Sequence, residues 1–273
     1  MTKKTFTIIV LIATLVLSCA TTGPGGKKSL IIIPTSQEVA IGAGMAQEVA
    51  QTEKVLDDPV WQSYLNEVGQ KIVSVCDRKD IQYHFTVIES DQVNAFAAPG
   101  GYIYFYTGLL QEMDNEAEMA MVLSHEISHV VARHGIKRLQ ASLGVAAAYE
   151  LVFGEDSTSA VLNTAIGLGL GLIFSGYSRE NEREADSYGM HYLVKAGYDP
   201  SAGLGMFEKL AAMGGEGSSS IFEQLSSSHP DSRERISNTK QQIAEMKPYP
   251  SGLRIGRDKY QEMLKRLSPK SGS

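Results

Sequence analysis

Residues 122–130 read V-L-S-H-E-I-S-H-V and place two histidines and a glutamate within five positions. His125 and His129 are four residues apart, so on a helix they lie on one face, about 6 Å apart along the axis. Two imidazole nitrogens at that spacing can bind one metal ion. Glu126 follows the first histidine, where its carboxylate could take a proton from a water molecule at the metal. The stretch therefore predicts a helix that carries a metal site.

The arrangement His-Glu-x-x-His is typical of zinc-dependent peptidases. The alternative is an ordinary amphipathic helix, because a pattern with only three fixed positions also recurs by chance. A peptidase site of this type needs a third ligand from elsewhere, commonly a glutamate on a following helix. Residues 178–196 predict such a helix, on which Glu182 and Asp186 are four residues apart and share one face. A charged run of this kind is otherwise usually a solvated surface.

Composition narrows the class of protein. The chain has 273 residues, of which 43% are hydrophobic, which is enough for one substantial core and one elaborated domain. A formal net charge of −6 gives no reason to expect nucleic acid as a partner. Cys19 and Cys76 are the two cysteines, so an internal disulfide is excluded if Cys19 is modified.

The N-terminus predicts a secretory signal with a lipid attachment site. Lys3 and Lys4 precede an apolar run, and Cys19 follows V-L-S in a pattern that resembles a bacterial lipobox. We therefore expect a signal peptide over residues 1–18, lipid on Cys19, and a lipidated tether over residues 19–35. Ala20 in place of aspartate favours delivery to the outer membrane of a Gram-negative cell, facing the periplasm. A plain signal peptide or an uncleaved anchor helix is the alternative.

Hydrophobic periodicity predicts the remaining elements. A strand is expected over residues 81–88 and a hairpin over residues 94–110, around the turn P-G-G. Its first strand, with Asn94, Ala95, Phe96 and Ala97, could offer a free edge to an extended peptide substrate, although plain sheet structure explains it equally well. The helices are expected over residues 36–51, 59–76, 115–140, 178–196, 198–213 and from about 230 to 246. Residues 247–273 are expected to form a polar C-terminal tail.

Two further features of the sequence are less clear. His134 lies nine residues after His125, and on a continuous helix it would point away from the face of His125 and His129, so we expect it to be structural. Residues 144–177 are apolar and rich in glycine. The densest part of this segment is shorter than the ~20 residues of a membrane span, so a buried or hinge-like helix is favoured.

Three separated motifs together resemble one family of proteins. They are H-E-x-x-H at residues 125–129, S-R-x-x-E-x-x-A-D at 178–186 and H-P-x-x-x-x-R at 229–235, with N-A-F-A-A-P-G-G at 94–101 as a further shared stretch. Their order and spacing are similar to those of the HtpX/BepA-like zinc metallopeptidases, a group that includes the CAAX-prenyl proteases and the mitochondrial Oma-type enzymes. The resemblance covers residues 36–246.

The resemblance implies one zinc ion per chain, with His125, His129 and Glu182 as ligands and Glu126 as the general base. It also implies an α+β, mainly helical fold, the minigluzincin fold, with a small β-sheet whose edge strand borders the active-site cleft. The zinc metallopeptidase domain would be residues 36–246.

The same resemblance suggests roles for three more residues. Asp186 would orient a ligand histidine from behind, and Arg235 would lie near the substrate or its oxyanion as a catalytic group. His229 would approach the zinc as a fourth ligand and regulate access to it.

The function implied is a zinc metalloendopeptidase, anchored to the outer membrane by a lipidated cysteine, that cleaves misfolded or unassembled envelope proteins. The expected partners are those substrates, the membrane and the outer-membrane assembly machinery. The sequence lacks the membrane helices of HtpX and the helical repeats of BepA, and looks more like the short lipoprotein members. The alternative is a periplasmic chaperone or binding lipoprotein that holds zinc structurally, in a closed site of four ligands, without turnover.

Overall fold

The computed structural model of the chain describes residues 19–22, 27–153, 160–213, 229 and 232–267. Its strands are β1 (Cys19–Thr22), β2 (Lys27–Leu30), β3 (His84–Ile88), β4 (Ala95–Ala98) and β5 (Tyr102–Tyr106). Its helices are α2 (Thr35–Thr52), α3 (Pro59–Val73), α4 (Thr107–Glu112), α5 (Glu116–Val131), α6 (His134–Phe153), α7 (Ala160–Phe174), α8 (Arg179–Lys195), α9 (Pro200–Met213), α11 (Ser232–Glu245) and α12 (Arg257–Leu264).

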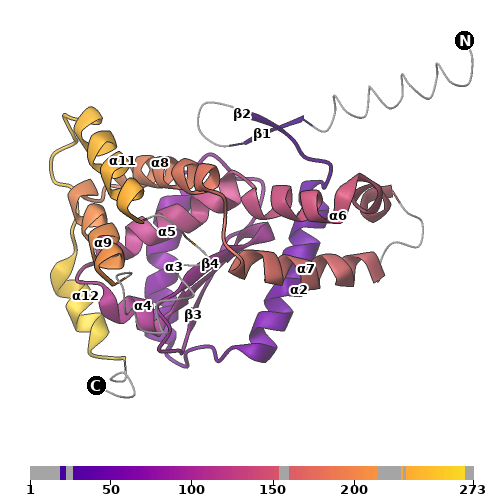
Figure 1. The fold of residues 1–273 in the computed structure, drawn as a ribbon. Helices are drawn as coiled ribbons and strands as arrows, with labels where there is room; N and C mark the ends of the chain where they lie inside the picture. Colours follow the sequence, from indigo (N-terminus) through magenta and orange to yellow (C-terminus); the bar gives the residue numbers. More distant parts are fainter. Residues whose placement is uncertain (1–18, 23–26, 154–159, 214–228, 230–231, 268–273) are drawn as a thin grey trace, which may run out of the picture.

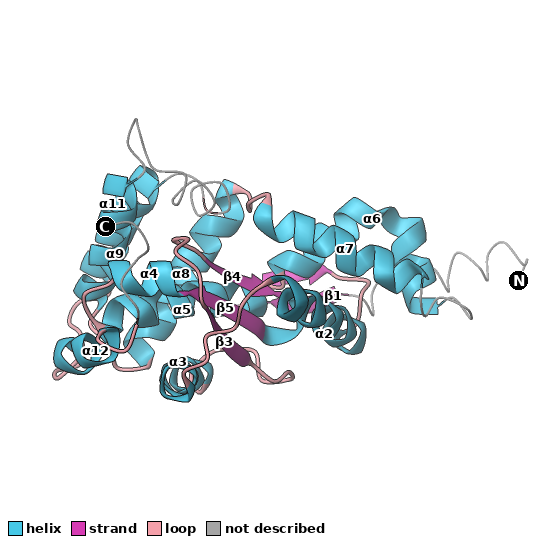
Figure 2. Cartoon of the chain, turned by 90° about the horizontal axis from the view of Figure 1, so that it is seen from below, coloured by secondary structure: helices cyan, strands magenta, loops and turns pink. Residues whose placement is uncertain are grey.

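The helices gather at the two ends of the molecule. Helices α9, α11 and α12 lie at one end, helices α2, α6 and α7 at the other, and the sheet of β3, β4 and β5 lies between them (Figure 1; Figure 2). The mainly helical α+β fold class is therefore confirmed.

The sheet is built around the predicted hairpin. Strand β5 lies in the middle, parallel to β3 and antiparallel to β4, so that β4 is an edge strand. The turn Pro99–Gly101 joins β4 to β5, with positive φ values of 77° at Gly100 and 94° at Gly101 that favour glycine. The hairpin is confirmed, while the strand predicted over residues 81–88 begins only at His84.

The sheet separates two hydrophobic clusters. Ala95 and Ala97 of β4 belong to the cluster that contains the inner face of α5, whereas Phe96 and Ala98 belong to the cluster packed against α2 and α7. This alternation is what a strand buried on both faces requires, because successive side chains point to opposite sides. Strand β4 is thus fixed in register beside the helix that carries the His-Glu-x-x-His motif.

Helix α5 is the central helix of the fold. Every residue of it except Val122 is buried, and it contacts α3, α8, α9 and strand β4. It begins at Asn115, whose side-chain oxygen accepts a hydrogen bond of 3.0 Å from the Glu118 N–H. The Glu118 carboxylate in turn accepts a 2.9 Å hydrogen bond from the Asp114 N–H. The side chains of Asn115 and Glu118 thus cap the start of this helix.

The single helix predicted over residues 115–140 is wrong. Helix α5 ends at Val131, and Arg133 adopts a φ of 55°, in the left-handed region that ends a helix. Helix α6 then starts at His134 in a new direction. The Arg133 guanidinium forms a 2.8 Å ion pair with Glu38 of α2 and donates a 2.9 Å hydrogen bond to the Ile33 carbonyl, and these contacts hold the break.

The folded domain extends beyond residues 36–246 at both ends. Helix α12 lies in the predicted polar tail, yet Tyr260 and Met263 are buried, and the Trp61 indole N–H donates a 3.0 Å hydrogen bond to the Met263 carbonyl. In the predicted tether, β1 pairs with β2, and Ile33 is buried beside α2. The signal peptide over residues 1–18 lies outside the described residues.

The apolar segment over residues 144–177 contains the end of α6 and all of α7. Helix α7 packs against α2 and α6 and buries Ala165 and Ile173, whereas Leu168 is exposed. Across the part of the chain that the structure describes, no helix combines the length and the apolar character that crossing a membrane requires. A packed helix is therefore what the structure shows here, in agreement with the buried or hinge-like helix that the sequence favoured over a membrane span.

Replacing Asn115 with alanine tests the start of the central helix. Loss of the cap should lower the free energy of unfolding by about 1 kcal/mol, measured by chemical denaturation. Asn66→Ala is the matched control, because Asn66 is an exposed residue inside α3 and should change the stability by no more than about 0.5 kcal/mol. Equal losses in the two variants would show that Asn115 has no special role.

Candidate metal centre

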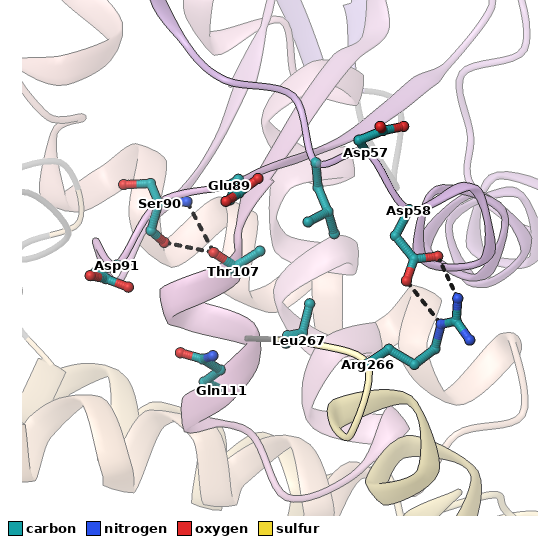
Figure 3. A pocket seen from close by; sticks show the side chains of 10 residues that line it. Asp57, Asp58, Glu89, Ser90, Asp91, Thr107, Gln111, Arg266 and Leu267 are labelled. Atoms are coloured by element: carbon teal, nitrogen blue, oxygen red, sulfur yellow. Dashed lines mark hydrogen bonds and ion pairs between the residues drawn. The ribbon is translucent and has the colours of Figure 1, made fainter. Parts of the chain in front are cut away.

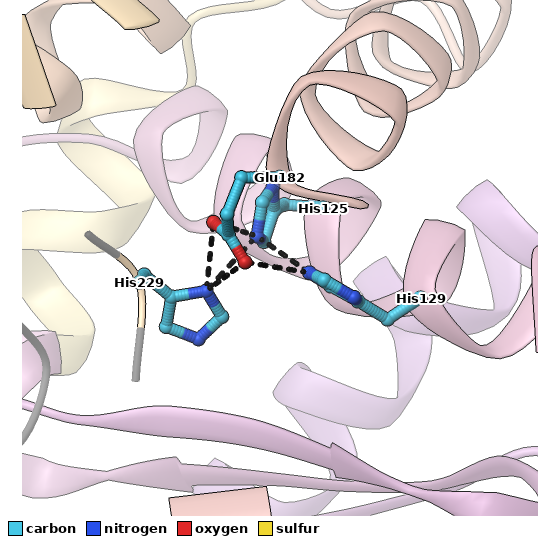
Figure 4. Close-up of side chains that lie close together, drawn as sticks. All are labelled: His125, His129, Glu182 and His229. Atoms are coloured by element: carbon cyan, nitrogen blue, oxygen red, sulfur yellow. Dashed lines mark hydrogen bonds and ion pairs between the residues drawn. The ribbon is translucent and has the colours of Figure 1, made fainter. Parts of the chain in front are cut away.

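Four side chains from three parts of the chain meet at one point. His125 and His129 come from α5, Glu182 comes from α8, and His229 lies just before α11 (Figure 4). One nitrogen or oxygen atom from each lies within 4.8 Å of the others, and all four residues are buried. Among the described residues this is the one such group of histidine, cysteine and acidic side chains.

The spacing of these atoms fits a tetrahedral metal ion. Ligand distances of about 2.0–2.1 Å place the ligand atoms of a tetrahedral zinc ion roughly 3.3 Å apart. Nε2 of His125 lies 3.0 Å from Nε2 of His129 and 3.2 Å from Nδ1 of His229. Oxygens of Glu182 lie 3.5 Å from His125 Nε2, 3.4 Å from His129 Nε2 and 3.1 Å from His229 Nδ1. The donor set therefore fits a four-coordinate metal.

The electrostatics of the cluster favour a cation. Two neutral imidazoles that both present lone pairs cannot approach to 3.0 Å unless a proton or a metal ion lies between them. Burial disfavours charge on His125, yet its hydrogen bonds to Asp186 and Glu182 prevail and raise its pKa to about 9. Burial lowers the pKa of His129 well below its usual value. The negative charges of Glu182 and Asp186 can be balanced by a proton on His125 or, in its place, by a bound metal ion.

Asp186 and Arg235 hold His125 from behind. Asp186 Oδ1 lies 2.8 Å from His125 Nδ1, and because a carboxylate only accepts, the proton of this ring is on Nδ1 and Nε2 faces the cluster. The Arg235 Nε and a terminal N–H both donate to Asp186 at 2.7 Å. Despite its burial, the positive charge of Arg235 and the hydrogen bond to His125 lower the pKa of Asp186 to about 2.

Arg235 contacts the acidic side chains of the cluster, and its expected role near the substrate stays a prediction. Besides Asp186, its guanidinium lies 3.3 Å from Glu182 and packs over the Phe207 ring at 4.7 Å. Burial alone would raise the pKa of Glu182, but its contact with His229, the positive charge of Arg235 and its interactions with His125 and His129 hold this pKa well below its usual value. The contacts of Arg235 thus hold the carboxylates of Glu182 and Asp186 in position.

His129 has two neighbours that the motif does not include. The Tyr177 ring stacks on its imidazole with the centroids 4.1 Å apart. His134 Nδ1 lies 2.9 Å from His129 Nδ1. The expectation that His134 points away is therefore wrong, because it assumed a helix that continues through Arg133. No signal in the sequence marked Tyr177, and its role appears only from the packing.

Glu126 lies beside the cluster without joining it. Its Oε1 lies 3.6 Å from His229 Nε2, and its Oε2 is buried without a hydrogen-bond partner in the described structure. Burial raises the pKa of this carboxyl group. A buried carboxylate oxygen without a partner is costly in free energy unless a water molecule or another donor occupies the space beside it.

The edge strand lies close to the same cluster. Ala97, Ala98 and Pro99 line a cavity of about 10 Å³ together with His129 and Tyr177, a volume that can hold about one water molecule. Neither polar atom of the buried Asn94 amide has a hydrogen-bond partner among the described residues. The structure thus brings β4 next to the metal cluster, as the sequence predicted.

A larger hollow lies elsewhere on the molecule (Figure 3). It has a volume of about 520 Å³, and acidic residues line it, among them Asp57, Glu89 and Asp91. Asp58 at its rim caps α3 and pairs with Arg266 at 2.9 Å, so its carboxylate is already engaged in the fold. None of the four donors of the metal cluster lines this hollow.

Comparison with known proteins agrees with this geometry. The chain is 29% identical over 270 residues to the beta-barrel assembly-enhancing protease of Yersinia pestis. This alignment covers 88% of the chain and 55% of that protein. It is 33% identical over 186 residues to the mitochondrial metalloendopeptidase OMA1 of Arabidopsis thaliana, with 68% of the chain and 37% of that protein covered. It is 32% identical over 163 residues to the metalloprotease YcaL of Escherichia coli (strain K12), with 59% and 62% covered.

The chain spans about half the length of the beta-barrel assembly-enhancing proteases that it matches. The sequence model of peptidase family M48 matches residues 59–243 of the chain. This range contains all four donors of the cluster together with Glu126, Asp186 and Arg235. Since the match covers well over half of the sequence, the chain belongs to peptidase family M48.

Proposed function

We propose that this protein is a zinc-dependent metalloendopeptidase of the bacterial envelope. The observation that carries the proposal is the buried set of His125, His129, Glu182 and His229, with the unpartnered carboxylate oxygen of Glu126 beside it. One zinc ion per chain fits the set, because nitrogen and carboxylate oxygen donors at this spacing suit a tetrahedral ion.

Each residue around the proposed zinc site has its own role in peptide hydrolysis. A zinc ion held by His125, His129 and Glu182 would supply the Lewis acidity that polarises the scissile carbonyl and makes water easier to deprotonate. Glu126 takes the proton of the attacking water and passes it to the leaving amine. Asp186 keeps the proton of His125 on Nδ1, and Arg235 holds the carboxylates of Asp186 and Glu182 in place.

The substrate that we propose is an extended segment of an unfolded or misassembled envelope protein. An edge strand can pair its backbone with such a segment without regard to sequence, and residues 94–97 lie at that edge. Relatives named beta-barrel assembly-enhancing proteases support a role in envelope protein quality control, near the outer-membrane assembly machinery. The lipobox-like pattern before Cys19 supports a lipid anchor in the outer membrane, facing the periplasm.

His229 makes the resting site a closed one in this proposal. Its Nδ1 fills the fourth corner of the donor set, and only 7% of the residue is exposed. A substrate carbonyl and a water molecule need that corner, so His229 must leave before catalysis. The protein is therefore latent at rest, and His229 regulates access to the zinc.

A zinc-containing chaperone or binding lipoprotein without turnover is the second candidate. The closed set of four protein donors favours it, because structural zinc sites are four-coordinate and offer no open position. The intact Glu126 beside the set favours the peptidase. Turnover of casein, measured with and without a chelator, separates the two functions.

Replacing Glu126 with glutamine tests the peptidase directly. The variant should retain about one zinc per chain but lose casein turnover by roughly 10²–10⁴-fold, because a neutral amide cannot accept the proton. Glu67→Gln, at an exposed position on α3, serves as the control and should retain full activity. Wild-type turnover in the Glu126 variant would remove the proposed general base.

Replacing His229 with alanine tests the gate. We expect casein turnover to rise several-fold, or zinc to bind at least tenfold more weakly if His229 also contributes strongly to affinity. Both quantities are measured on one preparation, and His84→Ala on β3 provides the control at an exposed histidine. No change in either quantity would contradict a role for His229 at the metal.

A further inference from the structure

We propose that His134 and Glu184 form a positioning device that orients His129 for metal binding. The proposal rests on the metal site of the proposed function, and it adds two residues outside its donor set. Neither residue is part of the His-Glu-x-x-His motif, and neither lies among the four donors.

The device is a chain of close contacts behind His129. His134 Nδ1 lies 2.9 Å from His129 Nδ1, and His134 Nε2 lies 3.0 Å from Glu184 Oε2. The other Glu184 oxygen accepts a 2.9 Å hydrogen bond from the Tyr188 hydroxyl. His134 is 1% exposed, so water does not compete for these contacts. The contacts therefore run unbroken from a carboxylate on α8 to the ring of His129.

The position of the protons follows from the chemistry of these groups. A carboxylate only accepts, so the Glu184 contact selects the proton on His134 Nε2 and leaves a lone pair on His134 Nδ1. That lone pair accepts the proton of His129 Nδ1. His129 then presents the lone pair of Nε2 toward His125, Glu182 and His229. In the reverse arrangement His129 Nε2 would carry a proton and could not bind a metal ion.

The break after α5 makes the device possible. On a continuous helix His134 would lie on the opposite side from His129, whereas the φ of 55° at Arg133 turns the chain and brings the ring back. Tyr177 stacks on His129 at 4.1 Å and lies 5.9 Å from the His134 ring, so it limits rotation of both. A left-handed conformation at a residue other than glycine is uncommon, and here it supports the site.

With this device, each of the two ligand histidines on α5 is supported by a carboxylate from α8. Asp186 supports His125 through one hydrogen bond, while Glu184 supports His129 through the intervening ring of His134. Both carboxylates come from α8, the helix that also supplies Glu182. A carboxylate behind a ligand histidine fixes its tautomer and strengthens metal binding.

The test compares zinc affinity in the full chain and three variants by competition with a chromophoric chelator. His134→Leu removes the acceptor and should weaken zinc binding by about 10–100-fold. His134→Asn places an oxygen near the position of Nδ1 and should recover most of the affinity. His84→Leu, the same change at an exposed histidine, should bind zinc as the wild type does. Thermal melting of each variant in excess chelator checks that the metal-free fold is intact.

Nuclear magnetic resonance of the ¹⁵N-labelled wild type gives a second readout that needs no variant. In the zinc-loaded protein we expect His134 to be neutral with its proton on Nε2. A proton on Nδ1 of His134, or unchanged zinc affinity in a folded His134→Leu variant, would overturn the proposal. If the wild type binds no zinc, the proposed function fails instead, so the two failures are distinguishable.

Discussion

The metal site imposes one constraint on the fold: four polar donors must lie within a few ångströms of one another in the buried interior. His125, His129, Glu182 and His229 are all buried, and their closest atoms are 3.0–3.5 Å apart. Such a set repels itself unless a cation lies among its members, and removal of any donor from water costs free energy. The surrounding structure must therefore supply both rigid placement and hydrogen bonds that point each donor inward.

The architecture meets this requirement with two packed helices and an edge strand. Helix α5 is buried along its length, so its two histidines cannot turn toward solvent, and α8 places Glu182, Glu184 and Asp186 against it. Asp186 and Arg235 lock the first histidine, while Tyr177 and His134 hold the second. The hairpin with β4 closes the side where Ala97 and His129 border one small cavity. The helices that carry the metal donors are therefore also part of the hydrophobic core.

The sequence predicted the parts of this site that depend on local spacing. The shared face of His125 and His129, with Glu126 beside it, follows from helix periodicity, and the hairpin follows from P-G-G between apolar runs. Glu182 was a candidate because it lies on a following helix, but its assignment rested on the resemblance to a family. His229 was assigned through that resemblance alone, because nothing local shows that a residue 104 positions after His125 meets it. The helix break was missed because Ala132 and Arg133 carry no glycine or proline signal, and that error misplaced His134. Helix α12 was missed because its composition is polar while Tyr260 and Met263 pack far from it in sequence.

We propose that three imidazoles and one carboxylate surround a single metal ion. X-ray absorption at the zinc edge, on the purified full chain, measures the number and type of ligands directly. We expect about four nitrogen and oxygen ligands at roughly 2.0–2.1 Å, with the multiple-scattering signature of three imidazoles. A six-coordinate shell dominated by water, sulfur scattering, or a signature of a single imidazole would contradict it.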